Sequence, residues 1–236
     1  VEFGGSELNE KYEGVIIDGN GKTMLPGLID AHGHVMGLGF QQLEVNLVGL
    51  KTLEETLNKI EEYADENPDL EWILGRGWNQ TLWPENEFPT AEDIDKVVSD
   101  RPVWLSRVDG HAGWGNTMAM RLAGVSQDTP DPQGGKIIRD SRGYATGVFI
   151  DAAEGYVYSI IPPDSDLKRK LALEKALEQM AKEGLTSVHD AGVDVKTWEL
   201  YKEFADSEKL TARIYGMISG AGPVFDTLSV NGPVNS

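Results

Sequence analysis

The sequence contains no cysteine and only four histidines among its 236 residues. The absence of cysteine excludes disulfide bonds and thiolate metal sites. Any transition metal must therefore be bound by histidine and carboxylate side chains. No apolar run approaches the roughly 20 residues that a membrane-spanning helix needs, so we expect no association with a membrane.

Basic residues are also scarce. Lysine and arginine number 21 against 39 aspartate and glutamate residues, which gives a formal net charge of -18. This charge disfavours nucleic acids and anionic membranes as partners. An apolar content of 40% in periodic segments is typical of a globular protein. Position 1 is valine, and no basic n-region or apolar h-region of a signal peptide follows, so we expect a cytoplasmic protein.

One short stretch carries the clearest chemical signal, residues 24–35, which read M-L-P-G-L-I-D-A-H-G-H-V. After a Pro-Gly turn, residues 28–35 are typical of a strand in which Asp30, His32 and His34 alternate and converge on one face. Two imidazoles spaced about 7 Å apart along a strand can share one metal ion. An acidic group beside them can orient a ring nitrogen, which makes Asp30 a candidate supporting residue.

The rest of the pattern predicts alternating helices and strands. We expect Ile29, Ala31 and Val35 to face a core, and Gly37–Gly39 to form a flexible loop. A capping box at Thr52 predicts a helix that ends near Asn67. The further expected elements are helices at 90–98, 111–122, 166–183 and 195–207, strands at 72–75, 102–108, 185–190 and 212–219, and a hairpin over 134–150. We expect Leu167, Leu171, Leu177, Met180 and Ala181 to form the apolar face of the 166–183 helix. The alternation after Pro163 indicates βα units with a parallel sheet.

The stretch at residues 24–35 resembles the first barrel strand of the amidohydrolase superfamily, whose pattern P-G-x-x-D-x-H-x-H is matched by Pro26, Gly27, Asp30, His32 and His34. Four further segments are similar to the YtcJ-like branch of that superfamily, amidohydrolase family 3, which includes N-substituted formamide deformylases. They are G-R-G-W-N-Q at 75–80, D-G-H-A at 109–112, G-V at 147–148 and G-L-T-S-V-H-D-A-G at 184–192. The resemblance spans nearly the whole chain.

The resemblance implies an α/β fold, a partial (β/α)8 TIM-barrel-like metal-dependent hydrolase fold. Residues 1–23 would be a remnant of the accompanying β-sandwich, and 24–39 the first barrel strand with its exit loop. Residues 40–165 would form a large insertion over the barrel mouth, and 166–236 further βα units of the barrel.

The resemblance also implies hydrolysis of non-peptide carbon–nitrogen bonds in a small-molecule amide substrate. His32 and His34 would bind a divalent metal, by default zinc, with one or two ions in the complete enzyme. A metal of this kind activates water and polarises a carbonyl. Imidazole and carboxylate ligands also suit iron, manganese and nickel.

The remaining histidines and two insertion residues are candidates for a pocket. His111 lies before an expected helix, and His189 near the end of an expected strand, where barrel active sites lie. Each is equally well explained as a structural residue. Trp78 and Asn79 stand in the insertion, whose tryptophans could line an apolar pocket, although most are expected to be core.

The lysine strand, the later histidines and the catalytic aspartate of the resembled superfamily cannot be placed in this sequence. We therefore expect the N-terminal part of a longer enzyme, inactive by itself. An open barrel edge would favour self-association. The alternatives are a catalytically inactive truncated fragment and a binding protein on the same fold.

Overall fold

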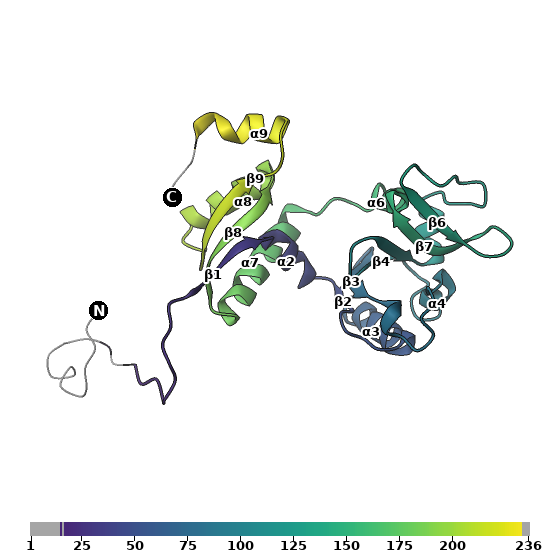
Figure 1. Cartoon of the computed structure of the whole chain (residues 1–236), viewed down its shortest axis with the longest axis horizontal. Coiled ribbons are helices and arrows are strands. Elements are labelled where there is room, and N and C mark those ends of the chain that lie inside the picture. Colours follow the sequence, from purple (N-terminus) through teal and green to yellow (C-terminus); the bar gives the residue numbers. More distant parts are fainter. Residues whose placement is uncertain (1–14, 16, 233–236) are drawn as a thin grey trace.

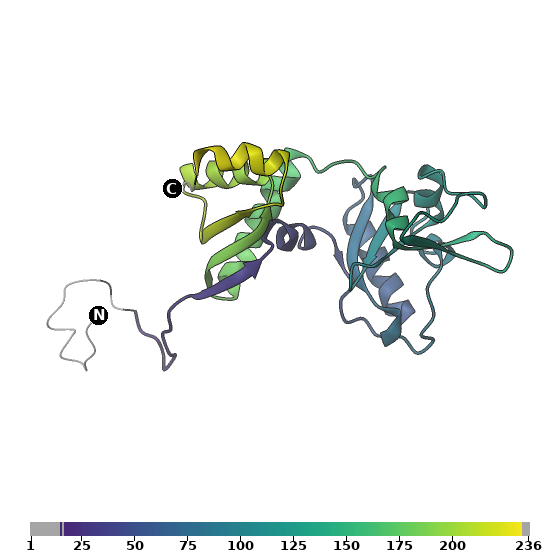
Figure 2. The same ribbon diagram turned by 45° about the horizontal axis from the view of Figure 1, so that its top comes forward.

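The chain forms two lobes, shown side by side in Figure 1, in a computed structural model that describes residues 15 and 17–232. Each lobe has its own sheet and its own apolar core. Two connections join them, one from α2 to β2 and one from α6 to α7, as the turned view in Figure 2 also shows. The first lobe therefore combines residues that are far apart in the sequence.

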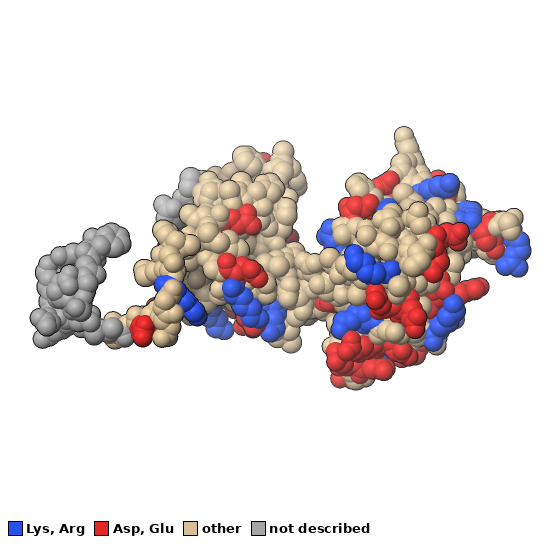
Figure 3. Space-filling model, turned by 60° about the horizontal axis from the view of Figure 1, so that its bottom comes forward, with Lys and Arg blue, Asp and Glu red and all other residues tan. Residues whose placement is uncertain are grey.

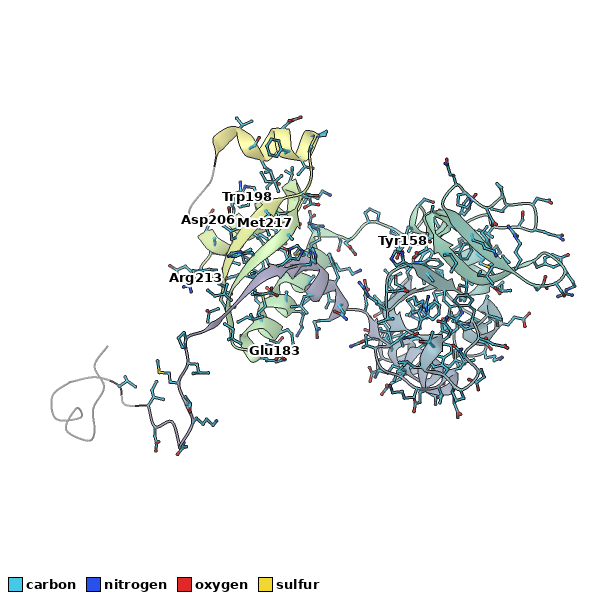
Figure 4. All side chains as sticks on the ribbon, in the orientation of Figure 1. Tyr158, Glu183, Trp198, Asp206, Arg213 and Met217 are labelled. Carbon is cyan, nitrogen blue, oxygen red and sulfur yellow. The ribbon has the colours of Figure 1, made fainter. Side chains whose placement is uncertain are left out.

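The first lobe is built on three parallel strands in the order β1-β8-β9. Helices α7 and α8 cover one face, where Leu173, Val188 and Phe204 share a buried cluster. Figure 4 shows this lobe with Trp198 of α8 and Met217 of β9 labelled. Its elements are β1 Leu28–Gly33, α2 Val35–Gln41, α7 Asp166–Lys182, β8 Leu185–Val193, α8 Val195–Asp206, β9 Arg213–Ile218, α9 Pro223–Leu228 and the short η3 Ser229–Asn231.

The second lobe holds a six-stranded mixed sheet in the order β2-β3-β4-β5-β7-β6. Strands β2, β3 and β4 run parallel, and the other pairings are antiparallel. Its elements are β2 Val45–Asn46, α3 Leu53–Glu66, β3 Ile73–Trp78, η1 Gln80–Leu82, α4 Ala91–Asp95, β4 Val103–Arg107, β5 Ala112–Gly115, α5 Thr117–Leu122, β6 Gly135–Arg139, β7 Ala145–Asp151, η2 Ala152–Glu154 and α6 Gly155–Tyr158.

Local sequence signals for helices and for the hairpin are confirmed. The Thr52 hydroxyl accepts the Glu55 N–H at 3.0 Å at the start of α3, as a capping residue should. The predicted hairpin is β6 paired antiparallel with β7. Helices α7 and α8 and strands β4, β8 and β9 lie within a few residues of their expected positions.

The strand predicted over residues 28–35 is shorter than expected. It ends at Gly33, and His34 is the residue that precedes helix α2. The expected loop at Gly37–Gly39 is part of that helix. A β-carbon on Gly39 would lie 2.0 Å from the Ala172 carbonyl oxygen of α7. The glycine therefore serves close helix packing rather than flexibility.

The prediction that Ile29 and Ala31 face a core is wrong for the described residues. Ile29 is 62% exposed, and Ala31 is exposed as well. Ile29 pairs with Ser187, on the sheet face opposite the buried Val188. Helices cover only the Val188 face, so side chains on the other face stay in contact with solvent. The prediction for Val35, which is 2% exposed, is confirmed.

Two further expectations are corrected. Residues 112–115 are strand β5 rather than the first half of a helix, because Gly113 lets the Trp104 ring lie against the backbone. Leu167 and Leu171 of α7 are 78% and 41% exposed. Ala181 is exposed as well, whereas the prediction is confirmed for Leu177 and Met180, which are buried together with Ala172, Leu173 and Ala176.

The predicted β-sandwich remnant, residues 1–23, lies mostly outside the described residues. Residues 1–14 and 16 are not described. Residues 19–22 form a turn, since the Lys22 N–H donates to the Gly19 carbonyl at 2.8 Å. Residue 15 and residues 17–27 contain no strand.

Candidate metal-binding site

The two histidines of the first strand end up next to each other. The His32 and His34 ring centroids lie 5.5 Å apart with the planes at 86°. Both residues are exposed. They come from the end of β1 and the residue before α2. The predicted convergence of the two rings is therefore present, although only His32 belongs to the strand.

The backbone around this histidine pair is held by two carboxylates. Asp30 accepts the backbone N–H of His32 at 2.9 Å, and Asp190 accepts that of Val35 at 3.1 Å. Asp30 thus contacts the main chain of the pair. Gly33 is required between the rings, because a β-carbon there would lie 2.7 Å from Cγ2 of Val188.

Asp190 is the supporting residue that the sequence analysis missed. Its side chain is buried in β8, and its second oxygen accepts the Tyr201 hydroxyl at 2.5 Å. Burial and this hydrogen bond raise the pKa of Tyr201. A buried carboxylate is stable only when its oxygens are hydrogen-bonded. The clue in the sequence was a charged residue, Asp190, directly after His189 in the predicted strand.

His189 lies on the strand next to the histidine pair. Gly33 of β1 pairs with Asp190 of β8, so the carboxyl ends of the two strands adjoin. The His189 ring lies 5.3 Å from that of Tyr215, its register partner on β9. Tyr215 is 64% exposed, which places this ring pair on the sheet face that no helix of the described chain covers.

A cavity of about 430 Å³ lies where the two lobes meet. Its walls include His34 and Phe40 from the first lobe, and Arg76 and Ser106 from the ends of β3 and β4. Glu44 also lines it. Burial raises the pKa of Glu44, which the nearby Lys168 ammonium at 3.8 Å opposes. The cavity therefore brings His34 together with charged groups of the second lobe.

His111 belongs to a different cluster, on the second lobe. Its Nδ1 lies 2.8 Å from an Asp151 oxygen, and its backbone N–H donates to Asp109. The hydrogen bond with Asp151 raises the pKa of His111. The neighbouring Glu154 is buried, and burial raises its pKa to about 7. His111 does not line the cavity that contains His34.

The two other candidates have structural surroundings. Trp78 is 1% exposed, packs against Trp83 and Trp114, and donates its indole N–H to the Leu105 carbonyl. It lies in the core and presents no surface to a ligand. The Asn79 side chain accepts the Thr81 N–H at 3.2 Å and so begins the short helix η1.

The two histidine rings are close enough for both to bind one metal ion. A zinc–nitrogen bond of about 2.0–2.1 Å means that two rings sharing an ion have centroids at most about 6.5 Å apart, and the observed separation is 5.5 Å. A catalytic zinc usually has three protein ligands. Over residues 15 and 17–232, no cluster of three or more His, Cys, Asp or Glu side chains is placed to hold a metal.

Fold and site together define an α/β protein with parallel strands and a histidine pair at a strand end. Comparison with known families identifies the class: the Amidohydrolase family matches residues 15–231. The chain belongs to this family. Within the described part of the chain, no helix is long and apolar enough to cross a membrane.

The chain is also similar to individual relatives. It is 35% identical over 203 residues to YtcJ of Bacillus subtilis (strain 168), covering 81% of this chain and 38% of that protein. It is 34% identical over 194 residues to the N-substituted formamide deformylase of Arthrobacter pascens, covering 79% and 36%. The chain thus spans less than two fifths of the length of either relative.

Two solved structures share the fold. Both are of uncharacterized metal-dependent hydrolases, one from Pyrococcus horikoshii OT3 and one from Pyrococcus furiosus. The TM-scores are 0.61 and 0.59, at 22% and 25% identity. Each comparison covers 82% of this chain, and 36% and 37% of the respective solved chains. The resemblance to the YtcJ-like branch inferred from sequence motifs is confirmed.

Proposed function

We propose that this chain carries the first metal-binding strand of a metal-dependent hydrolase that cleaves non-peptide carbon–nitrogen bonds in small amides. The observation that carries this proposal is the close pair of His32 and His34 rings at the carboxyl end of β1. Membership of the Amidohydrolase family supports hydrolysis, and the similarity to an N-substituted formamide deformylase supports an amide substrate.

The arrangement of strands supports a partial TIM barrel. In this proposal β1, β8 and β9 are the first three barrel strands, within residues 24–39 and 166–236, and residues 40–165 are an insertion over the mouth. Active sites of TIM barrels lie at the carboxyl ends of the strands. The cavity between the lobes combines His34 from that end with Arg76 of the second lobe, as an insertion over the mouth would require.

The residues of this chain would hold the metal and fix its ligands. His32 and His34 would each bind through one ring nitrogen, and zinc is the default ion for such ligands. Asp30 and Asp190 keep the two histidines in place through the backbone N–H groups of His32 and Val35. A bound divalent ion would lower the pKa of its water ligand and polarise the substrate carbonyl.

Metal binding by the chain itself tests the first part of the proposal. Two imidazoles fall short of the three protein ligands of a catalytic zinc site, so we expect weak zinc binding that a chelator reverses. His32→Ala and His34→Ala should each abolish it, whereas His111→Ala should not. Zinc content after equilibrium dialysis measures this. Unchanged zinc content in both pair variants would contradict the proposed ligands.

Turnover tests the second part. The full gene product, supplied with zinc, should hydrolyse members of a panel of N-formyl and N-acyl amides, and His32→Ala should remove that activity. The alternative is a binding protein on the same fold, or an inactive fragment. Both alternatives are favoured by the lack of a third metal ligand among the described residues. Binding of an amide without turnover in the presence of zinc would support the binding protein.

A further inference from the structure

The cavity between the lobes contains a cation without a carboxylate partner among the described residues. Arg76 lines the cavity and is exposed, and none of the ion pairs in the described chain includes it. Its guanidinium donates one hydrogen bond, to the Val108 carbonyl at 3.3 Å. That bond fixes one edge of the group and leaves the other N–H donors available to a ligand.

The sequence places Arg76 in the cavity through its two flanking glycines. A β-carbon on Gly75 would lie 2.3 Å from Val45, and one on Gly77, at a φ of +110°, 2.5 Å from Val48. Only glycine allows the chain at β2 to approach β3 this closely. The same alternation turns the side chain between them away from that contact and toward the cavity.

Neighbouring groups supply further donors and an apolar wall. Ser106 is the register partner of Arg76 on β4, so their side chains share one sheet face. The Ser106 hydroxyl lies 2.9 Å from that of Tyr158, which Figure 4 labels on the side of the second lobe that faces the first. Phe40 of α2 lines the same cavity.

The acidic group of the cavity does not neutralise Arg76. Glu44 is paired with Lys168, which also lies over the Phe40 ring. The charges that act on the Glu44 carboxyl come from Lys168 and Asp164. Elsewhere, acidic side chains gather over the second lobe in Figure 3. At physiological salt such exposed charges are screened beyond about 8 Å. Of the two charged side chains that line the cavity, Glu44 and Arg76, only Glu44 takes part in an ion pair among the described residues.

We propose that this cavity binds the carboxylate of an anionic amide substrate, with the Arg76 guanidinium as its partner and the Ser106 hydroxyl as an additional donor. A guanidinium matches a carboxylate because two parallel N–H groups can bond both oxygens. Phe40 offers an apolar surface to the remainder of the ligand. That the ligand is a substrate rests on the function proposed above. The binding of a carboxylate does not.

A matched pair of probes tests the proposal without any metal. Hippurate and its uncharged amide, hippuramide, differ in the carboxylate and share the benzoyl amide. Ligand-detected NMR titrations of the whole chain in EDTA give both dissociation constants. We expect hippurate to bind about tenfold more tightly than hippuramide, the preference that a charge-assisted bidentate pair provides. Arg76→Gln should remove the preference, and Arg76→Lys should retain part of it.

Arg121→Gln is the matched control. Arg121 is an exposed arginine on α5 that lies outside the cavity, so its variant loses the same charge and should keep the preference. Unchanged circular dichroism would show that the Arg76 variants are folded. A preference that survives in Arg76→Gln, or that is absent from the unmodified chain, would overturn the proposal. Because the assay excludes metal and turnover, either result leaves the His32 and His34 ligand test unaffected.

Discussion

The buried carboxylate of Asp190 should control the stability of the first lobe. It accepts the Val35 N–H at 3.1 Å and the Tyr201 hydroxyl at 2.5 Å. Hydrogen bonds to a charged group contribute about 1.5–3 kcal/mol each. Asp190→Ala removes both and leaves two buried donors without partners, so we expect a loss of about 3–5 kcal/mol.

Tyr201→Phe provides an independent measure of the same interaction. It leaves one oxygen of a buried carboxylate without its donor, which should cost about 1.5–3 kcal/mol. The double variant should lose less than the sum of the two single variants, because both act on one hydrogen-bond network. Asp206→Ala is the control, since Asp206 is an exposed carboxylate of the same lobe, labelled in Figure 4.

Hydrogen exchange resolved by peptide is the suitable assay, because the two lobes have separate cores and need not unfold together. Protection should fall in α2, β8 and α8 and stay unchanged in β3 and β4. Zinc retention should fall as well, because Val35 follows His34 directly. A loss below about 0.5 kcal/mol, the size of an ordinary surface substitution, would refute the reasoning.

Three other predictions concern the second lobe. Gly113→Ala should destabilise it by about 1–3 kcal/mol, seen as a lower urea midpoint, because the new β-carbon would lie 1.9 Å from the Trp104 ring. Burial and the Asp151 charge raise the pKa of Glu154 to about 7. The free energy of unfolding should therefore decrease as pH rises from about 4.5 to 7. Urea titrations of Glu154→Gln should show no such decrease. Asp151→Asn should lower the pKa of His111 in an NMR titration, because its hydrogen bond favours the charged imidazole; an unchanged pKa would contradict the contact.

Elements defined by local chemistry could be predicted from the sequence. The Thr52 cap and the apolar repeat after it specify α3 without reference to the rest of the chain. The helix–strand alternation after Pro163 likewise predicted parallel strands, which the β8–β9 pairing confirms. Signals of this kind depend on neighbours within one or two helical turns.

Elements defined by distant contacts could not be predicted. Gly39 is in a helix because α7, more than 130 residues later in the chain, approaches its backbone. Residues 112–115 form a strand because they pair with β7, more than 30 residues later in the chain, and Gly113 receives the Trp104 ring. In each case a glycine that suggests flexibility is instead a contact point, and only the packed partner reveals the difference.

The candidate site likewise has one part that could be predicted from local spacing and one that depends on distant contacts. The approach of His32 and His34 follows from their spacing, whereas their metal-binding role stays a prediction. Asp190 was missed because its bond to Val35 spans 155 residues. Arg76 belongs to the G-R-G-W-N-Q segment, but its position in the same cavity as His34 depends on how the two lobes meet.

Strand β8 presents different residues to the two faces of its sheet. Val188 and Asp190 point to the helix-covered face, where they pack and anchor α2. His189 lies between them in the sequence, and its ring lies 5.3 Å from the Tyr215 ring at an interplanar angle of 55°. Since side chains alternate between faces with a period of two, the two sets do not share contacts. Changes at His189 should therefore cost little stability, whereas changes at Asp190 affect stability first and the histidine pair through it.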